Sequence, residues 1–325
     1  MLTKRQNLME VMKGGKPDRF VNQYEFMEII MEAPIFAMCP PGGEMKDGWG
    51  VTFRWPEGQL GQFPVHDEEH LVLKDITEWR KYIKAPSVDY PEEKWAAAVE
   101  HANSVDRKEQ FVTAIVLPGL FEMTHHLMSM KGALIALYEE PEAMHEFIEY
   151  LADRELRTAK QVIDHLHPDA LFHHDDWGGQ ISTFISPEMF EEFFLPHYKK
   201  IYGFYKDNGV ELIVHHSDCY AATLVPQMIE MSIDIWQGAM STNNIPELIK
   251  KYGGQITFMG DIDSGVVDHP GWSREEIAKY VKISCKRCGK LYFIPCLSQG
   301  LNLSSFPEVY DTTSEEIDRI SKEMF

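Results

Sequence analysis

Short apolar runs alternate along the chain with longer segments whose apolar positions recur at helical spacing. A short continuous apolar run is typical of a strand that is buried on both faces of a parallel sheet. The alternation from end to end therefore predicts an α/β fold. The predicted strands comprise residues 19–26, 111–119, 169–177, 211–218, 233–238, 256–263 and 291–297.

These strands favour a (β/α)8 TIM barrel over a doubly wound sheet, since no Gly-rich dinucleotide-binding motif follows any of them. An eighth strand could lie in the less regular first third of the chain. We expect one domain that spans residues 1–325. Residues 40–66 are rich in Gly, Pro and aromatics without helical periodicity, which indicates an insertion, such as a small hairpin, near the barrel mouth.

Two helix starts carry clear sequence signals. Ser186 followed by Pro187 is typical of an N-cap and the first residue of a helix, and Gly209 is typical of the end of that helix. Thr3 and Gln6 have the spacing of a capping box at the start of the first helix.

Charge and hydropathy exclude several classes of partner. The chain has 31 Lys and Arg against 51 Asp and Glu, so it should repel nucleic acids and anionic membranes. No apolar run reaches the roughly 18 residues that a membrane span needs, and the N-terminus lacks an apolar signal core. The 5 scattered cysteines suit a reducing compartment. We expect a soluble cytoplasmic protein.

Ionisable side chains collect at the carboxyl ends of the predicted strands, whereas the first half of each strand is apolar. In a TIM barrel these ends converge on one mouth, where such enzymes assemble their active sites. The side chains concerned are His173, His174, Asp175, Asp176, His215, His216, Asp218, Asp261, Asp263 and Cys296.

Imidazole, carboxylate and thiolate groups at this mouth suit a catalytic Zn²⁺ site with an open position for substrate. Alternation along a strand places His216 and Asp218 on one side, and His215 and Cys219 on the other. A histidine pair at a strand end can instead be hydrogen bonded to neighbouring carboxylates, and Cys296 can instead be a small buried residue.

The same mouth holds candidate acids and bases. Adjacent carboxylates repel each other, so either Asp175 or Asp176 should have a raised pKa and serve as a general acid, with His174 as an alternative proton carrier. Glu122 is a further catalytic candidate, because it follows the end of a predicted strand. The alternative is a hydrogen-bonded polar layer that supports the site.

Aromatic side chains could form the wall of a pocket for an aromatic substrate. Phe53 and Trp55 belong to the insertion, whereas Trp177, Trp236 and His173 belong to strand ends. Each of them can alternatively belong to the core, where large aromatics usually pack.

The segment HHSDCYAATLVPQMIEMSIDIWQG, residues 215–238, resembles the pattern His-Ser-Cys-Gly, Leu-Ile-Pro, Leu-Ile-Glu-x-Gly-x-Asp of the uroporphyrinogen decarboxylase superfamily. Residues 46–53, 175–201 and 259–267 resemble further parts of its pattern. The resemblance spans nearly the whole chain and implies a (β/α)8 barrel.

This superfamily contains porphyrinogen decarboxylases and cobalamin-dependent methyltransferases. The decarboxylases carry an early arginine-rich stretch that holds the carboxylates of the substrate, whereas the corresponding residues 22–34 contain no arginine. Unpaired buried charges are costly, so decarboxylation ranks second. The chain is more similar to the methyltransferases that move methyl groups from methoxylated aromatics to a corrinoid protein in anaerobic O-demethylation.

Thiol-activating members of that branch bind zinc through a His-x-Cys pair and a distant Cys. By resemblance these ligands fall on His216, Asp218 and Cys296, with Cys219 as a substitute ligand if the strand twists there. The exchange of a thiolate for a carboxylate suits an ether or phenol oxygen better than a thiol.

We therefore expect methyl transfer between an aryl methyl ether and the Co(I) corrinoid (cobalamin) of a partner protein, since the chain has no cobalamin-binding Asp-x-His-x-x-Gly pattern. Zn²⁺, or a proton from His174, Asp175 or Asp176, would stabilise the phenolate. The alternatives are a uroporphyrinogen decarboxylase and a non-catalytic barrel that binds a tetrapyrrole or corrinoid.

Overall fold

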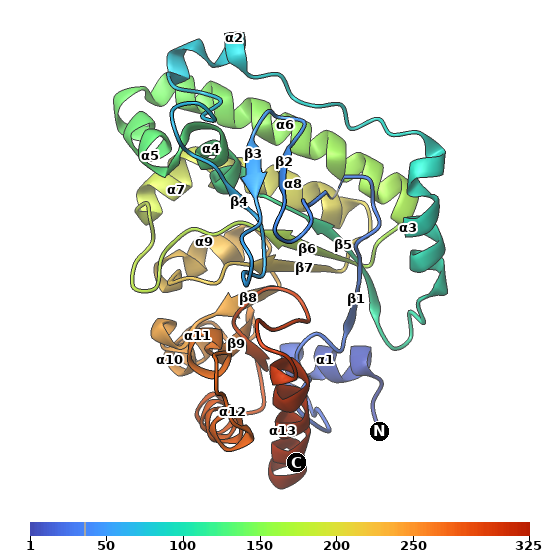
Figure 1. The fold of residues 1–325 in the computed structure, drawn as a ribbon. Helices are drawn as coiled ribbons and strands as arrows, with labels where there is room; N and C mark the ends of the chain where they lie inside the picture. Colours follow the sequence, from blue (N-terminus) through green and yellow to red (C-terminus); the bar gives the residue numbers. More distant parts are fainter. Residues whose placement is uncertain (36) are drawn as a thin grey trace.

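The computed structural model describes residues 1–35 and 37–325. Its centre is a curled parallel sheet with helices packed around it (Figure 1). The strand order is β1-β5-β6-β7-β8-β9-β10, and every neighbouring pair is parallel. The strands are β1 (Met27–Ile30), β5 (Phe111–Val116), β6 (Ala170–His174), β7 (Leu212–His216), β8 (Ile235–Ala239), β9 (Thr257–Ile262) and β10 (Phe293–Leu297).

Helices connect consecutive strands and cover the outside of the sheet. Within the described ranges, no helix has both the length and the apolar character needed to cross a membrane. The helices are α1 (Lys4–Lys13), η1 (Ile76–Glu78), α2 (Trp79–Tyr82), α3 (Glu92–Ser104), α4 (Leu120–Met128), α5 (Met130–Glu139), α6 (Pro141–Leu166), α7 (Pro187–Phe193), α8 (Leu195–Asp207), η2 (Ala222–Leu224), α9 (Val225–Glu230), η3 (Ser241–Asn243), α10 (Ile245–Tyr252), α11 (Ser264–Val267), α12 (Arg274–Cys288) and α13 (Val309–Met324).

The predicted TIM-barrel type of α/β fold is confirmed, but the first predicted strand is wrong. Residues 19–26 form no strand, and β1 begins directly after them. Gln23 has a left-handed φ of 48°. Its side chain donates to Ser314 (2.7 Å) and accepts the backbone N–H of Leu297 (3.2 Å). These contacts to distant parts of the chain hold the segment in a turn.

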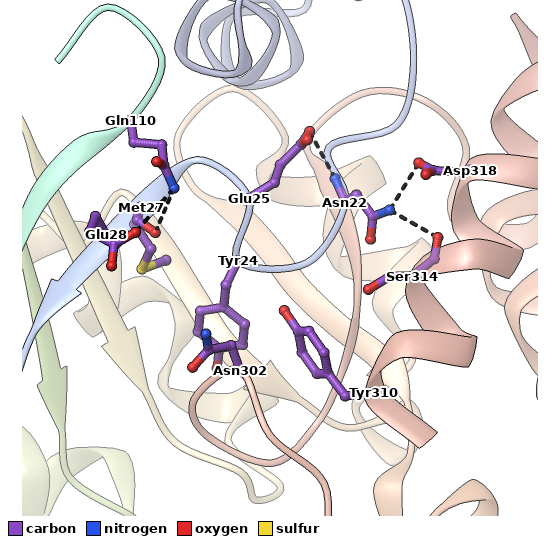
Figure 2. A pocket seen from close by; sticks show the side chains of 10 residues that line it. All are labelled: Asn22, Tyr24, Glu25, Met27, Glu28, Gln110, Asn302, Tyr310, Ser314 and Asp318. Atoms are coloured by element: carbon purple, nitrogen blue, oxygen red, sulfur yellow. Dashed lines mark hydrogen bonds between the residues drawn. The ribbon is translucent and has the colours of Figure 1, made fainter. Parts of the chain in front are cut away.

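Strands β1 and β10 are the edges of the sheet, and among the described residues no eighth strand pairs with both of them. A cavity of about 300 Å³ lies at this seam between β1 and α13 (Figure 2). Its lining includes Asn22, Glu25, Glu28 and Asp318. It contains none of the residues that the sequence places in the active site.

The predicted hairpin is confirmed, with a third strand added to it. Strands β2 (Glu44–Lys46), β3 (Thr52–Arg54) and β4 (Phe63–Pro64) form a small antiparallel sheet. Phe53 packs edge-on against His126 of α4, with ring centroids 5.4 Å apart. Because α4 directly follows β5, the small sheet lies against the carboxyl-end side of the barrel.

Alternation along the strands separates two cores. One fills the barrel, and the other lies between the sheet and the helices. The interior core includes Phe172, Val214, Ile235, Met259 and Ile294, whereas the exterior core includes Leu171, Ile213, Trp236, Phe258 and Phe293. By the same two-residue period, His174 and His216 continue the interior rows at the strand ends.

Both predicted helix starts are confirmed. The hydroxyl of Ser186 accepts a backbone N–H at the start of α7 (3.2 Å), and Thr3 with Gln6 forms the capping box of α1. The helix expected to continue to Gly209 is divided into α7 and α8. Pro196, at the second position of α8, has no N–H with which to continue α7.

The substitution Ser186→Ala is expected to lower the free energy of unfolding by about 1 kcal/mol, because a backbone N–H in the first turn of α7 loses its acceptor. Urea unfolding followed by circular dichroism would measure this change. Ser182→Ala is the matched control, since this exposed side chain makes no hydrogen bond with the described residues. Equal losses from both substitutions would contradict the capping role.

Candidate active site

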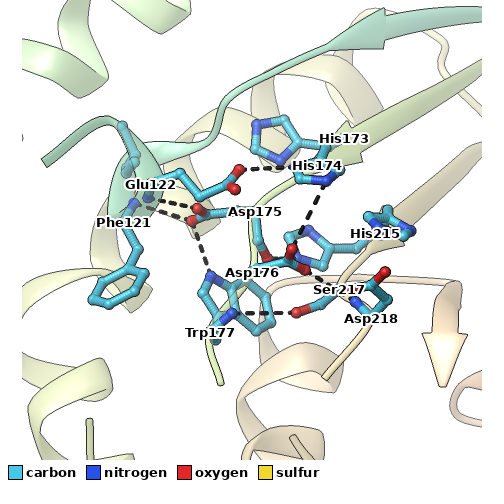
Figure 3. A network of polar contacts seen from close by, with 12 residues as sticks. Phe121, Glu122, His173, His174, Asp175, Asp176, Trp177, His215, Ser217 and Asp218 are labelled. Carbon is cyan, nitrogen blue, oxygen red and sulfur yellow. Dashed lines mark hydrogen bonds and ion pairs between the residues drawn. The ribbon is translucent and has the colours of Figure 1, made fainter. Parts of the chain in front are cut away.

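The ends of β6 and β7 bring two histidines together at the barrel mouth. Parallel pairing sets His174 opposite His216, and the two rings stack with centroids 4.5 Å apart and 21° between their planes. Figure 3 shows His174 near Glu122 and Asp176, and Asp176 beside Asp218. We call the space bordered by Glu122, His174, Asp176, His216 and Asp218 the recess.

Two carboxylates flank His174. Oε2 of Glu122, in the first turn of α4, lies 2.8 Å from Nδ1 of His174. Oδ2 of Asp176 lies 3.9 Å from Nε2 of the same ring, while Oδ1 of Asp176 accepts the backbone N–H of Asp218 (2.9 Å). The imidazole is therefore fixed at Nδ1, and its Nε2 is turned toward Asp176.

Gln237 at the end of β8 orients His216 in a similar way. The amide nitrogen of Gln237 donates to the backbone oxygens of Leu297 (3.4 Å) and Gln299 (3.2 Å). Its amide oxygen is therefore the atom that accepts the N–H of His216 Nδ1. Nε2 of His216 makes no hydrogen bond with any residue of the described ranges.

The recess is partly open to water. The side chains of His174 and Asp176 are 26% and 28% exposed, and Asp218 is an exposed residue. Burial by the surrounding protein nevertheless raises the pKa of Asp218 well above its usual range, and the charge of Asp176 adds to the effect. Asp218 therefore contacts water although the surrounding protein removes much of its hydration.

The charges in the recess give the two histidines very different pKa values. Burial lowers the pKa of His174, but the charges of Glu122 and Asp176 outweigh it and raise that pKa to about 10. Burial, with the charge of His174, lowers the pKa of His216 to about 4. Burial also raises the pKa of Glu122 to about 7, although the charge of His174 opposes the shift. At neutral pH His174 is therefore a cation and His216 is neutral.

Asp175 does not face the recess, contrary to its expected role as a general acid. It is fully buried and accepts the backbone N–H groups of Phe121 (3.0 Å) and Glu122 (2.7 Å), the indole N–H of Trp177 (2.9 Å) and the hydroxyl of Tyr198. Burial raises the pKa of Asp175, whereas these donors oppose the shift. Its carboxylate anchors the first turn of α4 and so positions Glu122.

His173 is also turned away from the recess, contrary to its expected contact with substrate. It is fully buried, with Nε2 2.7 Å from Oε1 of Glu155. The hydroxyl of Tyr202 lies 3.1 Å from Nδ1 of His173 and 2.8 Å from Nδ1 of His215. These side chains form the polar supporting layer that the sequence offered as the alternative.

The prediction of an aromatic wall around the substrate is wrong for Trp177 and Trp236. Trp177 and Trp236 are 0% exposed, and Trp177 stacks on His215 with ring centroids 4.0 Å apart. Both indoles belong to the exterior core. Phe53 and Trp55 lie in and beside the small antiparallel sheet, and their contact with a substrate stays a prediction.

Three ionisable side chains of the recess can hold a metal ion. One donor atom from each of His174, Asp176 and His216 lies within 4.8 Å of the other two. The ligands expected by resemblance, His216, Asp218 and Cys296, do not form such a group. Among the described residues, neither Asp218 nor Cys296 joins His216 in a group of that size.

The two expected thiol ligands lie in environments that disfavour the thiolate. Sγ of Cys219 is 3.1 Å from the hydroxyl of Ser217, and burial raises the pKa of Cys219 to about 12. Cys296 is 0% exposed inside the barrel, and burial raises its pKa well above the usual range, although a hydrogen bond with Gln237 opposes the shift. Metal binding requires the thiolate form of cysteine.

The sequence did not point to Gln237 or Gly300. Gln237 continues the interior row of Ile235, so alternation along β8 would have selected it. A Cβ on Gly300 would lie 3.1 to 3.4 Å from atoms of the His216 ring, a closeness that only the folded chain reveals.

His125 and His126, for which the sequence gave no special role, form a second group of possible ligands with Glu122. One donor atom from each of these three lies within 4.8 Å of the other two. Burial lowers the pKa of His125 to about 4, and the charge of His66 contributes to the shift. Glu122 is therefore a member of this second group and, through its hydrogen bond to His174, a neighbour of the first.

Comparisons with known proteins agree with this architecture. The family model described as uroporphyrinogen decarboxylase (URO-D) matches residues 48–313. A methyltransferase from Methanosarcina mazei is similar over 98% of this chain and 99% of its own, with a TM-score of 0.69 and 11% identity, which shows a shared fold. A glycosylated endo-β-1,4-xylanase of glycoside hydrolase family 10 from Gloeophyllum trabeum, at 9% identity over 70% of this chain and 81% of its own, has a TM-score of 0.40, too low to indicate one. No curated protein matches the sequence.

Two fully buried tyrosines of α8 allow a matched test of the Asp175 anchor. The hydroxyl of Tyr198 bonds Asp175 and accepts the N–H of Leu120 (2.8 Å), whereas the hydroxyl of Tyr205 has no partner among the described residues. Tyr198→Phe is expected to lower the free energy of unfolding by about 1 to 3 kcal/mol, and Tyr205→Phe is expected to lower it little or not at all. Urea unfolding measures both, and similar losses would contradict the anchoring role.

The charges around His174 predict its titration in the metal-free protein. Folding raises the pKa of His174 from its usual value of 6.5 to about 10. Protonation of His174 therefore stabilises the folded protein fully below pH 6.5, and this stabilisation is lost as the pH rises toward about 10. Glu122→Gln removes an attracting charge and is expected to lower that pKa. Side-chain ¹⁵N NMR of labelled histidine would follow the change. Glu139→Gln, an exposed carboxylate of α5, is the control, and His174 titrating near 6.5 in the unaltered protein would disprove the assignment.

Proposed function

The chain belongs to the uroporphyrinogen decarboxylase family, and we propose that within this family it is a methyltransferase. The proposed methyl donor is an aryl methyl ether, and the proposed acceptor is the Co(I) corrinoid of a partner protein. One observation carries the proposal: two histidines and three carboxylates converge in the recess, and within the described ranges none of these carboxylates forms a salt bridge with Lys or Arg.

A substrate with many carboxylates does not suit such a site. The charge of Asp176 raises the pKa of both Glu122 and Asp218, and the other charged groups that act on these two carboxyl groups are recess residues and Asp175. The cationic His174 offsets only one negative charge, so adding several further carboxylates is costly. A neutral methyl ether brings no such cost, so methyl transfer is preferred to uroporphyrinogen decarboxylation. Several ionisable groups turned toward one recess also favour catalysis over simple binding of a tetrapyrrole.

In the proposed reaction the bond between the methyl carbon and the ether oxygen breaks. Its electron pair stays on the oxygen, and the methyl group forms a bond to cobalt, which passes from Co(I) to Co(III). The phenolate then takes up one proton and leaves as a phenol. The barrier is lowered by any positive charge held against the oxygen as negative charge develops there.

His174 is the proposed source of that positive charge in the metal-free protein. Glu122 holds its Nδ1, so Nε2 remains to donate to the leaving oxygen. A cation bound by the same residues would act as a Lewis acid on the ether oxygen. Nε2 of His216 carries no proton, because Gln237 accepts the N–H at Nδ1, so it would serve as a ligand of such a cation. Phe53 and Trp55 are proposed to contact the aromatic ring.

The corrinoid is proposed to arrive on a separate small protein. The chain contains no cobalamin-binding motif of its own. The recess opens at the strand ends, so a corrinoid docked over the mouth would face it. The fold shared with a protein named as a methyltransferase supports this choice within the family.

Methyl transfer can be measured without the partner. With free cob(I)alamin and 1,2-dimethoxybenzene under reducing conditions, we expect the absorption of Co(I) to be replaced by that of methylcobalamin, with one 2-methoxyphenol formed per methyl group. His174→Gln is expected to lower the rate by about 100-fold, because the proposed donor to the leaving oxygen is lost. Tyr205→Phe is the control and should leave the rate unchanged.

The decarboxylase alternative makes the opposite prediction for a second assay. Incubation with uroporphyrinogen should give no coproporphyrinogen if the proposal holds. Conversion of uroporphyrinogen, together with no methyl transfer from any methoxylated aromatic, would reject the methyltransferase proposal. Binding of a corrinoid without turnover in either assay would reject both enzymatic functions.

A further inference from the structure

Both imidazoles of the recess are held at Nδ1 by a neighbouring side chain. Nδ1 of His174 bonds Glu122 (2.8 Å), and Nδ1 of His216 bonds Gln237. The amide nitrogen of Gln237 is occupied by two backbone carbonyls, so its oxygen must face His216. The two Nε2 atoms are therefore the available ligand atoms. Histidines that bind metal ions are commonly oriented in this way by an acceptor at the other ring nitrogen.

Asp176 supplies a third donor of fixed position. Its Oδ1 is held by the backbone N–H of Asp218 (2.9 Å), while Oδ2 lies 3.9 Å from Nε2 of His174. Ligands of a tetrahedral zinc ion, each about 2 Å from it, lie roughly 3.3 Å apart, so Oδ2 and Nε2 would approach each other by about half an ångström on binding. Two histidines and one carboxylate are also the protein ligands of several catalytic zinc sites.

These positions are set by the sheet rather than by flexible side chains. His174 and His216 are cross-strand partners in β6 and β7, and Asp176 follows His174 by two residues. The backbone of Gly300 lies over the His216 ring. A Cβ at this position would come within 3.3 Å of Nε2. The three ligand atoms thus converge with little conformational entropy left to lose.

The charge of the recess also suits a cation. It contains the carboxylates of Glu122, Asp176 and Asp218, and in the described part of the chain no Lys or Arg forms an ion pair with any of them. A divalent ion would offset charges that are costly to hold together.

Sulfur ligands do not fit this arrangement. Cys296 lies inside the barrel in contact with Gln237, the residue on the Nδ1 side of His216. Cys219 bonds Ser217 and belongs to the exterior core. Neither thiol shares a ligand group with the two Nε2 atoms among the described residues.

We propose that His174, Asp176 and His216 bind one divalent ion of the zinc class without a sulfur ligand, with Glu122 and Gln237 behind the two imidazoles. This set differs from the ligands inferred by resemblance, in which Cys296 binds the ion. The remaining coordination position faces the recess and is open to an oxygen ligand.

Cobalt(II) distinguishes the two ligand sets in the unaltered protein. Chelator-treated protein titrated with Co²⁺ should bind one ion per chain and show weak visible bands. A thiolate ligand would add an intense sulfur-to-cobalt band in the near ultraviolet, which we do not expect. This measurement needs no substitution, so it does not depend on whether a variant folds.

Substitutions then assign the ligands. His174→Gln, Asp176→Asn and His216→Gln should each weaken Zn²⁺ binding by more than about 100-fold, and Glu122→Gln by about 10- to 100-fold, because Glu122 only orients a ligand. Competition with a chromophoric chelator measures these affinities. Cys296→Ser should leave both the affinity and the cobalt spectrum unchanged.

His125→Gln is the matched control, because His125 belongs to the neighbouring group of possible ligands, Glu122, His125 and His126. Its Zn²⁺ affinity should equal that of the unaltered protein, and loss of binding would move the site to that group. The absence of stoichiometric binding, or a sulfur band that Cys296→Ser removes, would overturn the proposal. Metal binding is measured without a methyl donor, so its outcome is independent of the methyl-transfer assay.

Discussion

The register between β6 and β7 is the constraint on which the candidate site depends. Parallel pairing sets His174 opposite His216, and the two-residue alternation directs both into the barrel while His173 and His215 point to the helices. A slip of one residue would exchange the two faces of a strand. A slip of this kind in β6 would turn His174 toward the helices, and its contact with Glu122 would be lost. The site is therefore a property of strand pairing before it is a property of any one side chain.

The outward-facing polar groups hold that register from behind. Glu155, His173, Tyr202 and His215 form a continuous set of contacts between the sheet and helices α6 and α8. Nε2 of His215 lies 3.1 Å from the backbone oxygen of Asp175, whose carboxylate anchors α4. Buried polar groups of this kind are costly when unpaired, so they specify one arrangement of strand and helix. Glu122 is placed in the recess by this arrangement, although none of the supporting groups enters the recess itself.

Electrostatics connects the family to the proposed chemistry. A recess with three carboxylates and no ion-paired Lys or Arg among the described residues is a poor receptor for a polyanion and a good receptor for a cation. Several carboxylates gathered around one cationic histidine are typical of sites where function requires them. Both proposals draw on this one feature, because an oxygen that gains negative charge needs a compensating positive charge next to it. The membership of the chain in the family thus leaves the reaction to be decided by the residues of the recess.

The sequence by itself determined the elements whose signals are local. The apolar run at residues 111–119 and the cap at Ser186 act within a few positions, so period and spacing identify them. The first strand could not be identified in this way, since the turn at Gln23 depends on Ser314, 291 positions away. The sequence likewise placed ionisable groups at the mouth, but adjacent residues such as Asp175 and Asp176 look equivalent there. Only the tertiary structure decided between them, because burial and hydrogen-bond partners come from segments that meet only when the barrel closes.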